Sequence, residues 1–178
     1  YALAGGSGAR YYMFDRSSGS TRFVAESDGD PWELGVRAIS ADGAWSVMAG
    51  RDPGNLWARR LFLYEKASAT VHSVPLPDGC QVNSWAAPEI SADGRIVVFQ
   101  RFCNAGQESR VAAYDRDTGT TSLVPSATST KGGISRDGRF VVISSSHELL
   151  PGLVDTNSYL PDLFRYDWLT QETLLVNR

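Results

Sequence analysis

The sequence repeats one five-residue pattern, Ile-Ser-x-Asp-Gly, and each copy is followed by an apolar run. The copies begin at Ile39, Ile90 and Ile134. A second pattern, an aromatic residue followed by an acid, recurs in phase with the first. Its aromatic residues lie 50, 50 and 52 positions apart, at Phe14, Tyr64, Tyr114 and Tyr166. Two patterns that recur in phase at a near-constant spacing indicate a tandem repeat.

Each repeat predicts four short antiparallel strands. Asp-Gly between two apolar runs is typical of a tight turn, because Asp bonds the backbone two residues on and Gly adopts positive φ. The runs 96–99 and 140–143 are β-branched and aromatic, which suits strands buried on both faces. Asp117-Thr118-Gly119 predicts a second turn, between the third and fourth strands. Four antiparallel strands in about fifty residues match one blade of a β-propeller.

The chain is therefore expected to be all-β, a β-propeller or a contiguous piece of one, with about four blades. The expected blades cover residues 1–25, 35–75, 84–125 and 131–177. We expect the first blade to lack its innermost strand, because residues 1–4 match the second strand of a blade. We expect that the chain does not close on itself, and that either neighbouring sequence or self-association with a second copy completes the ring.

The repeat resembles that of a known family. The stretch from Ile90 to Val98, followed by Tyr114–Val124, is similar to the WD-repeat-like β-propeller repeat of TolB-type bacterial proteins. The segment 149–167 looks like that family's Leu-Val-Pro-Gly-Asp-Thr-Asn-Gly segment and the strand after it, with three inserted residues and with Ser158 in place of Gly. The resemblance covers nearly the whole chain. It implies the fold but leaves the function open, since such propellers serve as binding platforms, peptidase domains and lyases.

The two cysteines are expected to form a disulfide. Cys80 and Cys103 flank the first two strands of the third repeat, and the turn at Asp93-Gly94 folds those strands together. A bridge between residues 23 positions apart stabilises by about 3 kcal/mol on the chain-entropy model. The alternative is two unpaired thiols in a cytosolic protein. A disulfide favours a periplasmic or secreted location.

Composition argues against two classes of partner. The formal net charge is −3, which is too small to indicate a nucleic acid or an acidic membrane surface as partner. No run of apolar residues approaches the roughly 20 that a membrane-spanning helix needs. With 42% hydrophobic and 21% charged residues, the chain has the composition of a globular domain.

The sequence assigns no catalytic residue. His72 alternates with apolar residues of an outer strand, so it is expected to face solvent. His147 follows three serines, but no Gly-x-Ser-x-Gly nucleophile turn is present. The recurring acids of the Ser-x-Asp-Gly pattern are interpreted as turn formers: Asp42, Asp93 and Asp137.

One loop is a candidate calcium site. Asp155, Asn157 and Asp162 place three oxygen ligands on one loop, which suits a hard cation. The spacing is not that of an EF-hand, and the alternative is a solvated polar loop whose side chains bond the backbone. No other cofactor is expected, because the sequence has neither a Cys/His set for zinc nor a Gly-rich phosphate loop.

One end of the blades is predicted to carry the binding face. The loops that join second to third strands, and one blade to the next, vary in sequence and lie at the same end. Their Trp, Arg and Tyr residues are candidate anchors: Trp32, Arg51, Trp57, Arg59 and Tyr159. For each Trp, and for Trp45 and Trp85, the alternative role is packing between blades.

We therefore expect a noncatalytic extracytoplasmic binding module. A protein or peptide is the leading partner, and a carbohydrate is the other ligand class considered. The alternative is that the chain is the propeller portion of an enzyme, either a peptidase gating domain or a polysaccharide-active propeller.

Overall fold

The computed structural model describes residues 10–26, 35–52, 55–83, 86–103, 108–125, 129–145, 149–150, 152 and 160–177. These residues form fifteen β strands. No helix in the described ranges is long and apolar enough to cross a membrane. The strands are β1 (Arg10–Asp15), β2 (Ser20–Glu26), β3 (Gly35–Ile39), β4 (Trp45–Asp52), β5 (Asn55–Glu65), β6 (Thr70–Ser73), β7 (Cys80–Val82), β8 (Glu89–Ile90), β9 (Ile96–Cys103), β10 (Glu108–Asp115), β11 (Thr120–Leu123), β12 (Ser129–Ile134), β13 (Phe140–Ser145), β14 (Asp162–Asp167) and β15 (Thr173–Leu175).

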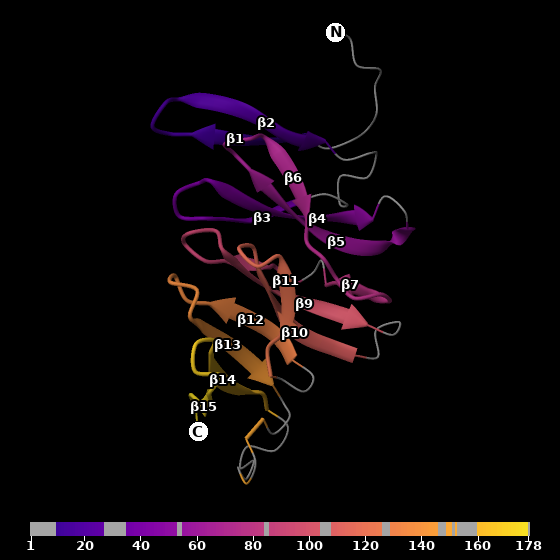
Figure 1. Cartoon of the computed structure of the whole chain (residues 1–178), viewed down its shortest axis with the longest axis vertical. Coiled ribbons are helices and arrows are strands. Elements are labelled where there is room, and N and C mark those ends of the chain that lie inside the picture. Colours follow the sequence, from indigo (N-terminus) through magenta and orange to yellow (C-terminus); the bar gives the residue numbers. More distant parts are fainter. Residues whose placement is uncertain are drawn as a thin grey trace.

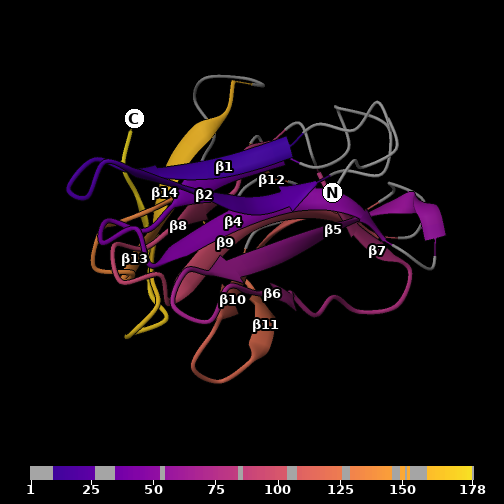
Figure 2. The same cartoon turned by 90° about the horizontal axis from the view of Figure 1, so that it is seen from above.

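The strands form four antiparallel sheets, which we call blades 1 to 4. Blade 1 is β1-β2, blade 2 is β3-β4-β5-β6 and blade 4 is β12-β13-β14-β15; in blade 3, β11-β10-β9 continues into both β7 and β8. Figure 1 shows the blades one after another from top to bottom, and Figure 2 shows them lying over one another when seen from above. The prediction of an all-β, propeller-type fold is confirmed.

Blade 3 has an innermost strand in two pieces. β7 pairs with residues 101–103 of β9, and β8 pairs with residues 97–98. The sequence predicts one strand near 84–90, whereas pairing already begins at Cys80. Pro88 directly precedes β8 and has no amide hydrogen to donate, so it does not extend the ladder toward β7.

The core consists of layers between neighbouring blades. Within β9, Val97 and Phe99 pack in the cluster shared with blade 2, whereas Ile96 and Val98 pack in the cluster shared with blade 4. A smaller cluster around Met48 joins blades 1 and 2. Strand alternation thus sends successive side chains to opposite blades, as predicted for strands buried on both faces.

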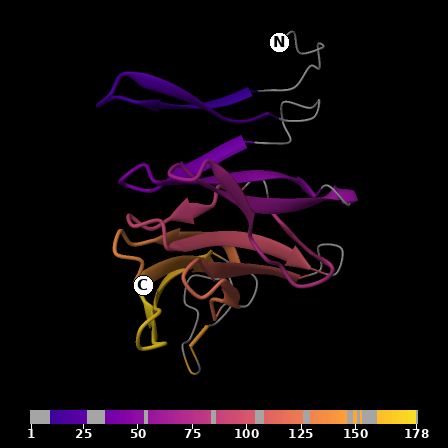
Figure 3. The same ribbon diagram turned by 45° about the horizontal axis from the view of Figure 1, so that its top comes forward.

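Equivalent positions differ sharply in exposure between inner and outer blades. Phe14 in blade 1 is 61% exposed, whereas its counterparts Tyr64 and Tyr114 are 1% and 8% exposed. On the opposite side, Val142 in blade 4 is 42% exposed and its counterpart Val98 is 1% exposed. Between inner blades, two such faces pack against each other. The outward faces of blades 1 and 4 are equivalent to the two faces of such an interface, but each is exposed. These faces lie at opposite ends of the molecule (Figures 1 and 3).

The Ser-x-Asp-Gly turns share one hydrogen-bond pattern. The Ser91 hydroxyl donates to Asp93 Oδ1 (2.6 Å) and accepts from the Ile96 amide (2.9 Å), while the Arg95 amide also donates to Asp93 (3.0 Å). Gly94 has φ 71°. The Ser91 hydroxyl holds the pKa of Asp93 below its ordinary value. The other two copies make the same bonds, which confirms the recurring acids as turn formers.

Successive turns are joined by backbone hydrogen bonds. The amide of Ala41 donates to the carbonyl of Ala92 (2.9 Å), and the amide of Ala92 donates to the carbonyl of Arg136 (2.8 Å). All three residues occupy the variable position of the pattern. The turns of blades 2, 3 and 4 therefore form a ladder along one end of the molecule.

In blades 2 to 4, the residue after the aromatic-acid pair packs at the boundary with the preceding blade. Lys66 Nζ lies 2.8 Å from Asp15 Oδ2, and the Arg116 guanidinium lies 4.2 Å from the centre of the Trp45 ring. Lys66, followed by the Ser17 hydroxyl, holds the pKa of Asp15 well below its usual range. In blade 4 the position is Trp168, which packs against the core between blades 3 and 4.

The predicted disulfide is confirmed. Cys80 and Cys103 are directly opposite in the register of β7 and β9, and their sulfurs are bonded at 2.06 Å. The bridge closes the end of blade 3 that lies away from the Asp93-Gly94 turn. It fixes β7, the piece of the innermost strand that pairs with β9 over three residues.

Candidate binding surfaces

The predicted binding face is described only in part. Arg51 in β4 and Arg59 in β5 are directly opposite in the strand register, so the structure brings these two together. Trp57 lies in β5, but its side chain is outside the described part of the chain. Trp32 and Tyr159 lie outside the described residues.

The candidate calcium loop stays a prediction. Asp155 and Asn157 lie outside the described residues, and Asp162 is the first residue of β14. The Asn177 side-chain amide donates to Asp162 Oδ1 at 3.4 Å. Within the described ranges, no three His, Cys, Asp or Glu residues form a group that could hold a metal ion.

His72 occupies the solvent-facing position expected of it. It lies in the outer strand β6, its side chain is half exposed, and its Nε2 is 2.9 Å from Thr70 Oγ1. The second histidine, His147, lies outside the described residues. The Trp45 ring packs against the core between blades 2 and 3, as expected for a tryptophan at a blade boundary.

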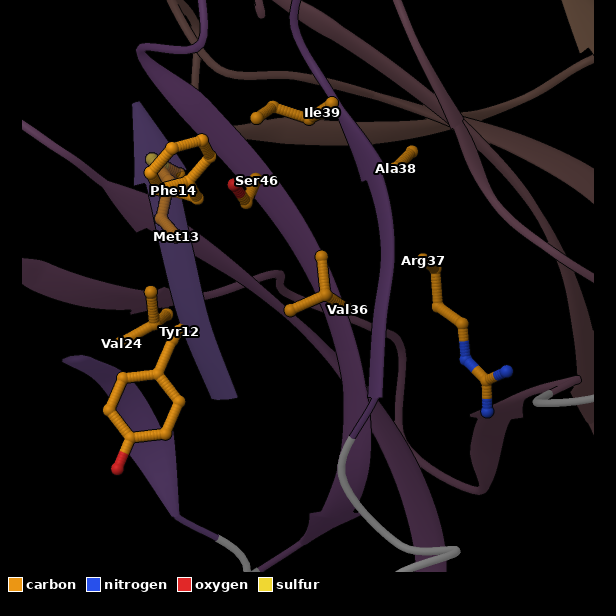
Figure 4. A pocket seen from close by; sticks show the side chains of 9 residues that line it. All are labelled: Tyr12, Met13, Phe14, Val24, Val36, Arg37, Ala38, Ile39 and Ser46. Carbon is orange, nitrogen blue, oxygen red and sulfur yellow. The ribbon is translucent and has the colours of Figure 1, made fainter. Parts of the chain in front are cut away.

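A groove that the sequence did not predict lies between blades 1 and 2 (Figure 4). It has a volume of about 310 Å³. Residues of β1–β2 form one wall and residues of β3–β4 form the other. Met13 and Val24 pack toward blade 2, whereas Tyr12 and Phe14 alternate to the outward face of blade 1 and border the groove. The second wall consists of Val36, Arg37, Ala38, Ile39 and Ser46.

An irregularity in β3 shapes this groove. Val36 pairs with Met48 and Ala38 pairs with Val47, so Arg37 is the extra residue of a bulge. The bulge lets Val36 and Ile39 face blade 1 together, while Arg37 points away from the groove (Figure 4). Val36 and Ile39 are substantially exposed, at 43% and 52%.

The groove occupies the place of a strand. In blades 2 to 4 the third strand pairs on both sides, as β5 does with β4 and β6. Its counterpart in blade 1 is β1, which pairs only with β2 within the described part of the chain. The groove beside β1 therefore corresponds to the second-strand position of blade 1. The sequence assigns residues 1–4 to this position, and they lie outside the described residues.

Comparison with sequence models of protein families finds none that matches, and comparison with curated proteins finds no match either. Solved propeller structures do resemble the chain. The β-propeller domain of the Trilobed protease from Pyrococcus furiosus superposes with a TM-score of 0.65 at 11% identity, over 96% of this chain and 49% of that one. TolB from Acinetobacter baumannii gives 0.55 at 14% identity, over 96% and 41%. Oligogalacturonate lyase from Vibrio parahaemolyticus gives 0.62 at 13% identity, over 95% and 43%.

These similarities establish the fold alone, because all three identities are low. They confirm the structural resemblance to TolB-type and related propellers. The chain spans about half, or less, of the length of the solved structures to which it is compared. The three proteins include a protease and a lyase, so the shared fold does not identify a function for this chain.

Proposed function

We propose that this propeller is a noncatalytic binding module, and that the groove between β1 and β3 takes an extended segment of a protein or peptide partner. The exposed apolar lining of the groove carries the proposal. Val36 and Ile39 are 43% and 52% exposed and lie together on the wall that blade 2 contributes. Contiguous exposed apolar surface on a folded domain marks an interaction site.

A strand-like occupant fits the position best. A peptide in extended conformation can add to a sheet edge through backbone hydrogen bonds, while its alternating side chains give specificity. The second strand of blade 3 shows what such a position accepts, since Val97 and Val98 are 0% and 1% exposed and point to opposite blades. Only blade 2 covers this position in blade 1, so we expect a partner segment whose β-branched or aromatic residues occur at alternate positions and face blade 2.

An extracytoplasmic location forms part of this proposal. The Cys80–Cys103 bridge supports it, because structural disulfides persist in oxidising compartments. Non-reducing mass analysis of protein from periplasmic and cytosolic fractions tests the location. Protein that is found only in the cytosolic fraction, with both thiols free to alkylate, would remove this part of the proposal.

Selection from a random peptide library, followed by calorimetry, tests the groove. We expect enrichment of extended apolar sequences whose dissociation constant rises at least about tenfold in Val36→Asp, a loss of about 1.4 kcal/mol. Leu169→Asp is the matched control, because Leu169 is 76% exposed and lies in the turn after β14, away from the groove. It should leave affinity unchanged.

Three results would contradict the proposal. The library could yield no enriched sequence, or the two variants could lower affinity equally. Peptide binding that appears only after removal of residues 1–9 would instead assign the groove to the chain's own first segment.

A further inference from the structure

Four arginines occupy facing positions in blades 2 and 3. Arg51 and Arg59 are opposite one another in β4 and β5. Arg101 and Arg110 are opposite one another in β9 and β10. We call these four residues the arginine cluster. In both blades they lie near the loop that joins the second strand to the third, so they share one end of the molecule.

Strand alternation directs all four toward the same interface. Residues two positions apart in a strand point to the same face of the sheet. The neighbours two positions from the four arginines all belong to the core cluster between blades 2 and 3: Ala49, Leu61, Phe99 and Ala112. The arginine cluster therefore ends this core layer, on the side where β5 and β7 lie in contact (Figure 1).

Arg101 is the deepest member and is not satisfied. It is only 8% exposed. Its Nη1 donates to Cys80 Sγ at 3.1 Å, a weak acceptor, and its buried Nε has no hydrogen-bond partner. No described carboxylate forms an ion pair with it. A buried charge without a counter-charge is costly, and among the described residues only the Cys80 sulfur accepts from this guanidinium.

We propose that the arginine cluster binds an oxyanion, a carboxylate or phosphate group, between blades 2 and 3. Guanidinium groups present paired donors that match the oxygens of either group. The unsatisfied Nε of Arg101 supplies the inner donor, and the other three arginines project toward the same interface. This site is separate from the groove beside β1 and does not depend on peptide binding there.

Thermal unfolding of the whole chain at pH 7 tests the site. Phosphate and citrate, each at 10 mM or less, are compared with chloride at equal ionic strength. When the free oxyanion concentration is about ten times its dissociation constant, its binding should raise the Tm of the chain by about 4 °C. A rise with phosphate alone assigns a phosphate group, and a rise with citrate alone assigns a carboxylate.

Two variants and one control separate the site from general salt effects. Arg101→Met keeps the volume of the side chain and should abolish the rise. Arg59→Gln, on a partly exposed strand, should reduce the rise at least by half, and it keeps the test valid if Arg101→Met does not fold. Arg136→Gln is the control, since Arg136 is exposed in a turn at the other end of the blades, and it should keep the full rise.

The proposal is overturned if phosphate, citrate and chloride give the same Tm for the parent chain. It is also overturned if the rise persists undiminished in Arg59→Gln, or if it is lost equally in Arg136→Gln.

Discussion

The guanidinium of Arg139 forms a bidentate ion pair with the carboxylate of Asp167: Nη2 lies 2.7 Å from Oδ2, and Nε lies 3.1 Å from both oxygens. Arg95 and Asp115 repeat this pair in blade 3. In blade 2 the arginine position is occupied by Ala44, so the pair is absent there. Where present, it joins the start of the second strand to the end of the third.

The Arg139–Asp167 pair should make stability depend on pH. Arg139, with the Leu169 and Thr170 amides, lowers the pKa of Asp167 from 3.8 to about 2. A depressed carboxyl pKa stabilises the fold above the unfolded value and loses that effect as pH falls through the folded value. Asp167→Asn should therefore lower the free energy of unfolding most at pH 5 to 7 and progressively less from about pH 4 to 2. Urea unfolding of parent and variant at several pH values measures this, and a difference that stays constant with pH would contradict it.

Two turn glycines provide a matched test of packing between blades. Gly94 and Gly119 have nearly equal φ values of 71° and 68°. A Cβ at Gly94 would meet the Trp45 ring at 2.5 Å, whereas a Cβ at Gly119 would meet nothing within 4 Å. Gly119→Ala should cost about 1–2 kcal/mol, the price of a left-handed alanine. Gly94→Ala should cost about 1–3 kcal/mol more because of overpacking. Equal losses in denaturant unfolding would show that the Trp45 ring moves aside freely.

The Arg116–Trp45 contact should stabilise the boundary between blades 2 and 3. Arg116→Gln is expected to lower the free energy of unfolding by about 0.5–1 kcal/mol, the range for a cation–π contact at an exposed site. Arg16 holds the equivalent position in blade 1, where it is exposed, so Arg16→Gln should have no measurable effect. A double-mutant cycle with Trp45→Leu isolates the coupling, and a coupling energy near zero would exclude the contact as a source of stability.

The outward faces of blades 1 and 4 should promote self-association. Phe23 and Val176 are 51% and 59% exposed, and their faces correspond to the two sides of an inner blade interface. Light scattering should give a mass above the 19.4 kDa of one chain, and Phe23→Ser with Val176→Ser should return it to that value. Leu169→Ser, in the turn after β14, should not. A single-chain mass at every concentration would contradict this expectation.

Local sequence predicted most of the fold. The Asp93-Gly94 turn fixes which residues oppose each other, so the Cys80–Cys103 bridge followed from spacing alone. The break between β7 and β8 was not predicted, because the effect of Pro88 on the ladder depends on how far the innermost strand can pair.

The candidate sites depend on contacts between blades, so only part of them could be predicted. Arg51 and Arg59 were identified because they flank a variable loop. Arg101 was not, since its burial arises only when blade 3 stacks on blade 2. The groove requires the bulge at Arg37, and the residues directly beside it, Val36 and Ala38, are not the Gly or Pro that would reveal a bulge in the sequence.

The four residues of the Ser-x-Asp-Gly pattern contribute in different ways to the ladder of turns. Ser, Asp and Gly act through their hydroxyl, their carboxylate and their freedom at positive φ. The second residue contributes only its amide and carbonyl to the bonds between blades, and it is Ala41, Ala92 and Arg136 in the three copies. Substitutions at this position can therefore change the charge of that end of the molecule without altering the pitch from one blade to the next. The scaffold thus has a row of sites, one in each of blades 2 to 4, at which surface chemistry can diverge while the architecture stays constant.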